Sequence, residues 1–271
     1  MRQLLIEWLS PCKSHFTRSF VLKDTLRQIA NLVTTLIALT VNILASTLPL
    51  NGQNTGEISD RFQVYFVPAG YVFAIWGIIY IGWIAFTIFQ YRGDQKESPR
   101  LRRLGYLFAI SNLFNAAWLF TWHYNFFGLG VLVMLSLLGL LIGSYLRLNV
   151  NRSSAQGAEW WSVDLPFSIY LGWITVATVA NVTDWLYLVH WSGFGIPATI
   201  WAVIMIVVAS IVGLLMALTR RDAAYLFVLV WSFIGIALKQ TPAPVVVTSA
   251  WIAAAAMFVL AVYSIWRQRS A

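Results

Sequence analysis

The chain of 271 residues is 59% hydrophobic and only 10% charged, with 14 tryptophans and a formal net charge of +8. This composition excludes a soluble globular protein, because so few polar residues cannot cover the surface of a fold of this size. The single cysteine, Cys12, excludes an intramolecular disulfide and a cysteine-cluster metal site.

Residues 1–27 form a basic and mildly apolar N-terminal segment. Glu7 and Asp24 argue against a transit peptide, since such peptides are poor in acidic residues. The first long apolar run, residues 28–48, exceeds the apolar core of an ordinary signal peptide. We therefore expect a retained membrane anchor, although small residues near its end leave cleavage open.

Eight long apolar runs follow along the chain, and most are long enough for helices that cross a bilayer core about 30 Å thick. Strand-like alternation of apolar and polar residues is absent, which disfavours a membrane β-barrel. The predicted spans are residues 28–48, 66–90, 104–122, 128–146, 166–183, 197–218, 224–238 and 245–266. The sequence therefore predicts an all-α integral membrane protein with eight spans.

The positive charges separate to one side of these spans. Of the 18 Lys and Arg residues, 16 fall on the side of the N-terminus, and only Arg61 and Lys239 fall on the other. Because Lys and Arg are retained on the cytoplasmic side of membrane proteins, both termini are expected to be cytoplasmic. The plasma (inner) membrane is the expected location, and the charge placement gives no reason to expect nucleic-acid binding.

The apolar runs divide into two groups. Residues 28–188 are expected to form a core of five membrane helices, and residues 197–266 to add three C-terminal transmembrane helices before a cytoplasmic tail at residues 267–271. Polar residues, glycines and a proline interrupt the apolar pattern near residues 184–196. The connection at residues 49–65 is rich in turn-forming residues and could cap a cavity.

Tryptophan repeats with tyrosine, alanine and asparagine at helical spacing inside the uncharged runs. Residues three, four, seven or eight apart share one face of an α-helix. Three stripes result: Trp76 with Tyr80, Asn115 with Trp118 and Trp122, and Trp173 with Ala177 and Asn181. Aromatic faces stack on planar π-systems, and amide and phenol groups bond a few polar atoms, so these stripes predict a site for a flat apolar ligand.

A simpler interpretation accounts for many of the tryptophans, because Trp and Tyr gather at membrane interfaces in any multi-span protein. It applies to the tryptophans near span ends: Trp160, Trp161, Trp185, Trp191, Trp201 and Trp266. For the deeper Trp76, Trp118 and Trp173, plain helix packing is the competing interpretation. Buried asparagines can likewise serve only to hold helices together.

The predicted spans contain no Lys, Arg, Asp or Glu, which disfavours an ion-coupled pump or a proton relay. His15, His123 and His190 lie outside the apolar runs, so no metal site is expected. His123 and His190 fall on the same outer face, either as solvated loop histidines or as an axial contact to a haem-like ligand. No catalytic motif stands in a workable context, and no enzymatic activity is assigned.

Residues 28–188 resemble the TspO/MBR family of tryptophan-rich sensory proteins, related to the peripheral benzodiazepine receptor. The resemblance rests on three segments: PAGYVFAIWGIIY at 68–80, NAAWLFTW at 115–122 and PFSIYLGWITVATVAN at 166–181. It implies a five-helix bundle around a pocket for porphyrins and other flat hydrophobic ligands, roofed by the loop after the first helix. By position it implies a pocket wall of Trp76, Tyr80, Asn115, Trp118, Trp173, Ala177 and Asn181.

Together these features predict a membrane binding or sensory protein that holds a porphyrin-like or tetrapyrrole-like ligand. No cofactor is required for this function, and the bound species would be a porphyrin or haem. The expected partners are the lipid bilayer and an apolar planar small molecule, with a homodimer left open. Two other classes also stay open: a permease for a neutral apolar compound, and a structural membrane subunit whose last three helices dock a partner.

Overall fold

The computed structural model describes the backbone of residues 2–48 and 50–269 and the side chains of residues 22–48 and 50–268. Within these residues the chain is helical and has no strand. Three side chains discussed above lie outside the described residues: Glu7, Cys12 and His15.

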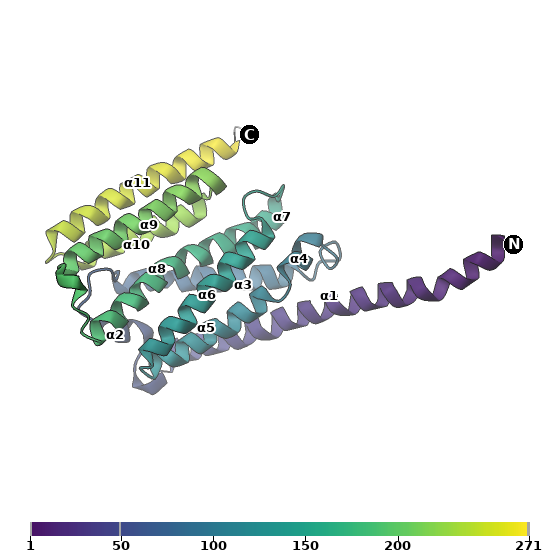
Figure 1. Cartoon of the computed structure of the whole chain (residues 1–271), viewed down its shortest axis with the longest axis horizontal. Helices are drawn as coiled ribbons and strands as arrows, with labels where there is room; N and C mark the ends of the chain where they lie inside the picture. The colour runs from purple at the N-terminus through teal and green to yellow at the C-terminus, as the bar shows by residue number, and fades with distance from the viewer. Residues whose placement is uncertain (1, 49, 270–271) are drawn as a thin grey trace.

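Eight long helices dominate the described part of the chain (Figure 1), and each overlaps one of the eight apolar runs. They are α1 (Arg2–Thr47), α3 (Ile75–Phe89), α5 (Leu107–His123), α6 (Phe127–Leu148), α8 (Leu165–Leu188), α9 (Ala198–Arg220), α10 (Ala223–Lys239) and α11 (Pro244–Arg269). Short elements connect them: η1 (Leu50–Gly52), α2 (Thr55–Asp60), η2 (Gly70–Ala74), α4 (Pro99–Leu104), α7 (Gly157–Glu159), η3 (Trp160–Asp164) and η4 (Gly193–Gly195).

Six helical segments of the described chain are long and apolar enough to cross a membrane. They are Leu22–Thr47, Gly70–Phe89, Phe127–Leu148, Gly157–Leu188, Ala198–Arg220 and Pro244–Gln268. The protein is therefore an integral multi-pass membrane protein. Helices α5 and α10 have 17 residues each, which is about 25 Å at 1.5 Å per residue and less than a bilayer core. The count of eight spans and the cytoplasmic termini stay predictions.

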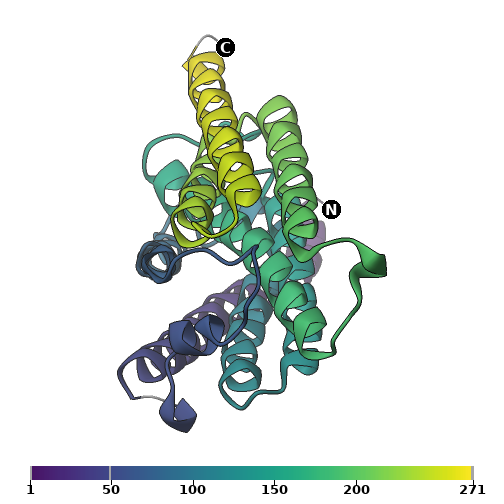
Figure 2. The ribbon, with the colours of Figure 1, turned by 90° about the vertical axis from the view of Figure 1, so that its left-hand side faces the viewer.

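The helices form two groups that lie side by side (Figures 1 and 2). Helices α1, α3, α5, α6 and α8 make one bundle, in which α5 packs on α1 and α6, and α8 packs on α3 and α6. Helices α9, α10 and α11 make the second group, and α10 joins the two groups by packing against α8. The aromatic stripes of the first bundle therefore lie close to part of the second.

Glycines allow helices to approach closely, both within the first bundle and between the two groups. A Cβ atom on Gly82 of α3 would lie 2.8 Å from Cβ of Pro166 on α8. A Cβ atom on Gly172 of α8 would lie 3.1 Å from Cβ of Val228 on α10. Lipid tails are as apolar as the helices, so the hydrophobic effect does not drive membrane helices together. Small residues let the helices approach closely and associate through van der Waals contacts instead.

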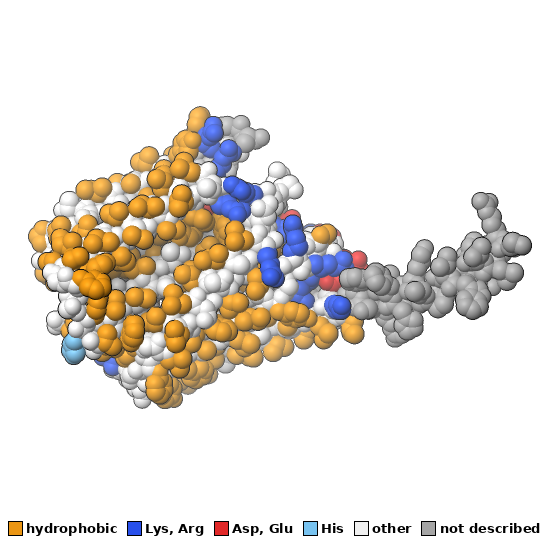
Figure 3. Space-filling model, viewed as in Figure 1, with side chains coloured by type: hydrophobic (Ala, Val, Ile, Leu, Met, Phe, Trp, Pro, Cys, Tyr) orange, Lys and Arg blue, Asp and Glu red, His pale blue; other side chains and the backbone are white. Residues whose placement is uncertain are grey.

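The outer surface is apolar along the helices and basic at one end (Figure 3). Side chains such as Ile81 and Leu132 are 69% and 62% exposed, as expected of residues that face lipid tails. Lys and Arg side chains gather at the end where α4, α7 and the end of α11 lie. Arg61 and Lys239 belong to the opposite end, where Lys239 Nζ pairs with Asp60 Oδ1 at 2.7 Å.

Helix α8 is longer than the sequence pattern indicated. It continues to Leu188 rather than ending at residue 183. The predicted span 166–183 is therefore too short. Asp184, one of the polar residues that interrupt the apolar pattern after residue 183, lies within the helix and is 1% exposed.

Candidate ligand cavity

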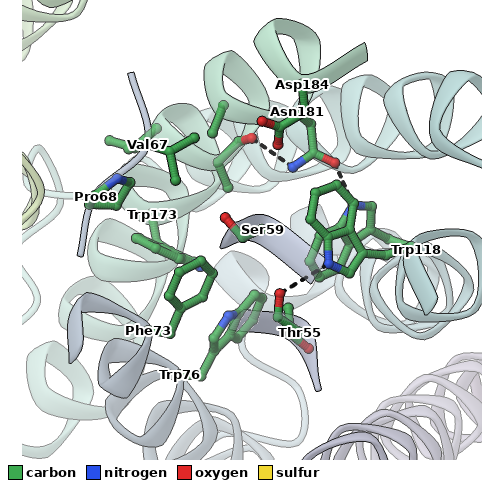
Figure 4. A pocket seen from close by; sticks show the side chains of 14 residues that line it. Thr55, Ser59, Val67, Pro68, Phe73, Trp76, Trp118, Trp173, Asn181 and Asp184 are labelled. Carbon is green, nitrogen blue, oxygen red and sulfur yellow. Dashed lines mark hydrogen bonds between the residues drawn. The ribbon is translucent and has the colours of Figure 1, made fainter. Parts of the chain in front are cut away.

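A cavity opens among α2, η2, α3, α5 and α8 (Figure 4), at the end of the bundle where α2 lies (Figure 1). The space inside its wall is about 440 Å³ including the part open to solvent, but only about 30 Å³ of it is free for a water-sized molecule. Small-molecule sites commonly measure about 300–1,000 Å³, so the cavity is nearly closed in this structure. The wall is formed by Thr55, Ser59, Val67, Pro68, Phe73, Trp76, Trp118, Trp122, Trp173, Val176, Ala177, Ala180, Asn181 and Asp184.

Helix α8 supplies the longest stretch of this wall. Trp173, Ala177, Asn181 and Asp184 follow at intervals of four, four and three residues, which places them on one helical face. Ala177 adds little bulk to that face, so space remains between its larger neighbours. The middle of the stripe is therefore its least bulky part.

Two aromatic groups face each other across the cavity. On one side, Trp173 meets Trp76 and Phe73 edge to face, with ring centroids 6.2 Å and 5.7 Å apart. On the other side, Trp118 stacks on Trp122 with centroids 5.6 Å apart and planes 26° apart. Figure 4 shows Trp118 opposite Phe73 and Trp173. A flat molecule between the groups would meet ring faces or edges on both sides.

The structure brings six of the eight predicted ligand residues to this wall. They are Trp76, Trp118, Trp122, Trp173, Ala177 and Asn181. Tyr80 and Asn115 lie outside the wall, in a hydrogen-bonded chain that crosses the bundle. Tyr80 Oη donates to Asn42 Oδ1 at 2.7 Å, and Asn42 Nδ2 donates to Asn115 Oδ1 at 2.8 Å. These bonds hold α1, α3 and α5 together.

Most polar groups of the wall are bonded within the protein. Trp118 Nε1 donates to Asn181 Oδ1 at 2.8 Å, and Asn181 Nδ2 donates to the Ala177 carbonyl at 3.0 Å. Trp122 Nε1 donates to the Thr55 carbonyl at 3.3 Å. Asn181 therefore orients an indole ring and is not a free amide directed at a ligand.

Two buried polar atoms of the wall have no hydrogen-bond partner among the described residues: Asp184 Oδ1 and Trp173 Nε1. Sequence reasoning singled out Trp173 but missed Asp184. A signal was present, because Asp184 comes three residues after Asn181 and so shares its helical face. It was overlooked because the helix was expected to end before this residue.

The roof of the cavity is α2, which contributes Thr55 and Ser59. Helix α2 begins at a capping box, in which Asn54 Oδ1 accepts from Glu57 N and Glu57 Oε2 accepts from Asn54 N, each at 2.9 Å. His123 anchors the roof to α5, because its Nε2 lies 3.1 Å from Thr55 Oγ1. The roof is thus a bonded element and not a loose loop.

The environment of His123 bears on the haem interpretation. His123 is buried, and its Nδ1 lies 3.2 Å from the Leu50 carbonyl while its Nε2 lies 3.1 Å from Thr55 Oγ1. Neither nitrogen is free, so His123 is neither a solvated loop histidine nor a ready axial ligand. His190 is exposed in the connection after α8. The cavity wall itself contains no histidine, cysteine or methionine, and so offers a haem iron none of its usual axial side chains.

Helix α10 backs the wall segment that includes Val67 and Pro68. Gln240 Nε2 donates to the carbonyls of Val64 and Val67 at 3.1 Å and 3.2 Å. The Gly235 carbonyl accepts from Ala69 N at 3.0 Å. The second helix group therefore supports one side of the cavity.

Comparison with known proteins agrees with this arrangement. A family model described as TSPO-like protein matches residues 28–263. The match extends beyond the five-helix bundle and includes α9, α10 and most of α11. Among curated proteins and among solved structures, nothing matches the chain.

Proposed function

The chain belongs to the TSPO-like family, and from this membership we propose that its aromatic cavity binds a flat, largely apolar ligand of the tetrapyrrole type. Family and membrane-spanning helices together make the chain a membrane sensory or binding protein. The observation that carries the finer proposal is the pair of aromatic groups, centred on Trp173 and Trp118, that face each other across the cavity.

The wall suits a metal-free porphyrin better than haem. It offers indole faces and edges for a planar π-system and lacks the histidine, cysteine and methionine side chains that commonly bind haem iron. A full macrocycle needs far more room than the about 30 Å³ that is free in the cavity. We therefore propose that α2, which roofs the cavity, moves outward when such a ligand enters and gives up the contacts of Thr55 with His123 and Trp122.

Titration of the purified protein with protoporphyrin IX, followed by tryptophan fluorescence, tests the proposal. Trp118→Ala and Trp173→Ala should each weaken binding about tenfold, because a stacked aromatic contact of about 0.5–1.5 kcal/mol is lost together with buried area. Trp161→Ala is the matched control, since Trp161 is 64% exposed and lies outside the wall. Equal affinity in the wild type and both cavity variants would rule out this cavity as the binding site.

A further inference from the structure

Asp184 places a carboxylate oxygen without a hydrogen-bond partner in the described cavity wall, and this restricts which ligands fit the cavity. We propose that the ligand carries a positively charged or N–H donor group, and that Asp184 receives this group. The inference rests on the proposed function, because it assumes that the aromatic cavity is the binding site. It goes further by naming which kind of planar molecule the site prefers.

Burial makes the ionised side chain of Asp184 energetically unfavourable unless a cation or a hydrogen-bond donor binds it. The residue is 1% exposed, lines the cavity and leaves Oδ1 without a hydrogen-bond partner in the described part of the chain. A buried carboxylate without a partner is unfavourable, because it loses water and gains nothing in return. Stability alone therefore gives no reason for an acid at this position.

Lys239, the basic residue whose charge acts on Asp184, is already paired. Lys239 interacts electrostatically with Asp184 across the end of α10, but its Nζ contacts Asp60 Oδ1 at 2.7 Å. The neighbouring amide of Asn181 is bonded to Trp118 and to the Ala177 carbonyl. Neither neighbour donates to Asp184 Oδ1.

The rest of the wall agrees with a cationic planar ligand. Ring faces attract a cation through their negative quadrupole, and tryptophan does so most strongly. Trp173 Nε1, which also has no hydrogen-bond partner among the residues that the structure describes, supplies one donor for an acceptor atom elsewhere on the ligand. The site therefore combines aromatic surfaces, one acceptor carboxylate and one indole donor. Carboxylate groups on a ligand would have to lie away from Asp184.

Two planar probes of the same three-ring shape test the inference, with the full-length protein in nanodiscs of zwitterionic lipid. The probes are 9-aminoacridine, a cation with N–H donors, and anthracene, which has neither charge nor donor. Quenching of tryptophan fluorescence reports the affinity of each. Asp184→Asn should weaken 9-aminoacridine binding about tenfold or more, because a charge-assisted hydrogen bond is lost. Anthracene binding should not change, which also shows that the variant is folded.

Asp94→Asn is the control, since it removes one negative charge at an exposed residue outside the wall and leaves the pair of Lys239 with Asp60 intact. Its 9-aminoacridine affinity should equal that of the wild type. The inference is overturned if Asp184→Asn binds both probes as the wild type does, or if Asp94→Asn weakens the cation equally. Failure of the proposed function looks different: the wild type binds neither probe, or Trp118→Ala and Trp173→Ala bind both unchanged.

Discussion

At the scale of single residues, one hydrogen bond sets the orientation of an aromatic wall. Trp118 Nε1 donates to Asn181 Oδ1 at 2.8 Å, and Trp118 in turn stacks on Trp122. Both partners of the bond are buried. A buried indole N–H without an acceptor would lose its hydration and gain no bond in return.

Asn181→Leu should therefore destabilise the protein by about 1–3 kcal/mol, because it leaves the indole N–H of Trp118 unpaired at nearly constant side-chain volume. The midpoint of thermal unfolding in detergent measures the loss. The double variant Asn181→Leu with Trp118→Phe removes both partners and should lose less stability than the sum of the losses of the two single variants. Purely additive losses would mean that the bond contributes nothing.

Asp222 offers a second test at this scale, through pH. It lies between α9 and α10, fully buried, where Oδ2 accepts from Tyr145 Oη and from Ser168 Oγ, each at 2.6 Å. Burial raises the pKa of Asp222 above the usual 3.8, and the hydrogen bonds from Ser168 and Tyr145 oppose the rise. A carboxyl group whose pKa is higher in the folded protein than in the unfolded chain contributes to the free energy of unfolding. This contribution is fully present below the pKa of the unfolded chain and is lost as pH rises through the pKa of the folded protein.

The free energy of unfolding should therefore fall as pH rises above about 3.8, and Asp222→Asn should show a shallower fall over that window. Urea unfolding of the detergent-solubilised protein at a series of pH values gives the slope. Asp60→Asn controls for the loss of an exposed carboxylate and should retain the wild-type slope. A slope for Asp222→Asn as steep as the wild type would contradict the assignment.

At this scale, sequence reasoning reached six of the fourteen residues of the cavity wall. Helical spacing identifies which residues share a face, and six of the predicted residues do line the cavity. Spacing does not say which neighbour a face meets. Asn115 lies against Asn42, 73 positions away in the chain, and Thr55 reaches the wall only because α2 folds over it. Such contacts depend on tertiary structure and leave no local pattern.

At the scale of elements, α10 is the support of one cavity wall. It contacts the segment before α3 through the Gly235 carbonyl and through Gln240. The close approach requires glycine, because a Cβ on Gly235 would collide with Val72 Cγ2 and lie 3.0 Å from Pro68 Cβ. No local pattern predicts this requirement, because the glycine's neighbours are more than 160 positions away.

Gly235→Ala should lower the free energy of unfolding by about 1–3 kcal/mol, since the added methyl group overpacks the contact between α10 and the segment before α3. It should also weaken protoporphyrin IX binding, because Pro68 belongs to the cavity wall. Gly139→Ala on α6 is the control: its Cβ would meet nothing within 4 Å, so stability should stay level or rise by about 0.5–1 kcal/mol. Equal stability of the two variants would show that α10 does not press on the wall.

At the scale of the whole molecule, the positions of the long helices followed from the apolar runs, because the bilayer imposes length and composition on any span. The ends of the helices were predicted less well from the apolar runs, as at α8. Buried contacts, and not composition alone, decide where a helix ends. The relation between the two helix groups could not be predicted at all. The last three helices looked separate in sequence, yet α10 packs on α8 and backs the cavity, so the two groups together form its surroundings.

The membrane crossing of α5 is the least obvious part of the predicted topology, and two matched cysteines test it in a Cys12→Ser background. Glu97→Cys and Tyr124→Cys flank α5 at exposed positions. With a cytoplasmic N-terminus and eight spans, residue 97 lies inside and residue 124 outside.

A thiol reagent that cannot cross the membrane should label Tyr124→Cys in intact cells and Glu97→Cys only after permeabilisation. Labelling of both from the same side would mean that α5 does not cross, and the reverse pattern would invert the orientation. Because 16 of 18 basic residues lie on one side only if α5 crosses, we expect the first result even though α5 is only about 25 Å long.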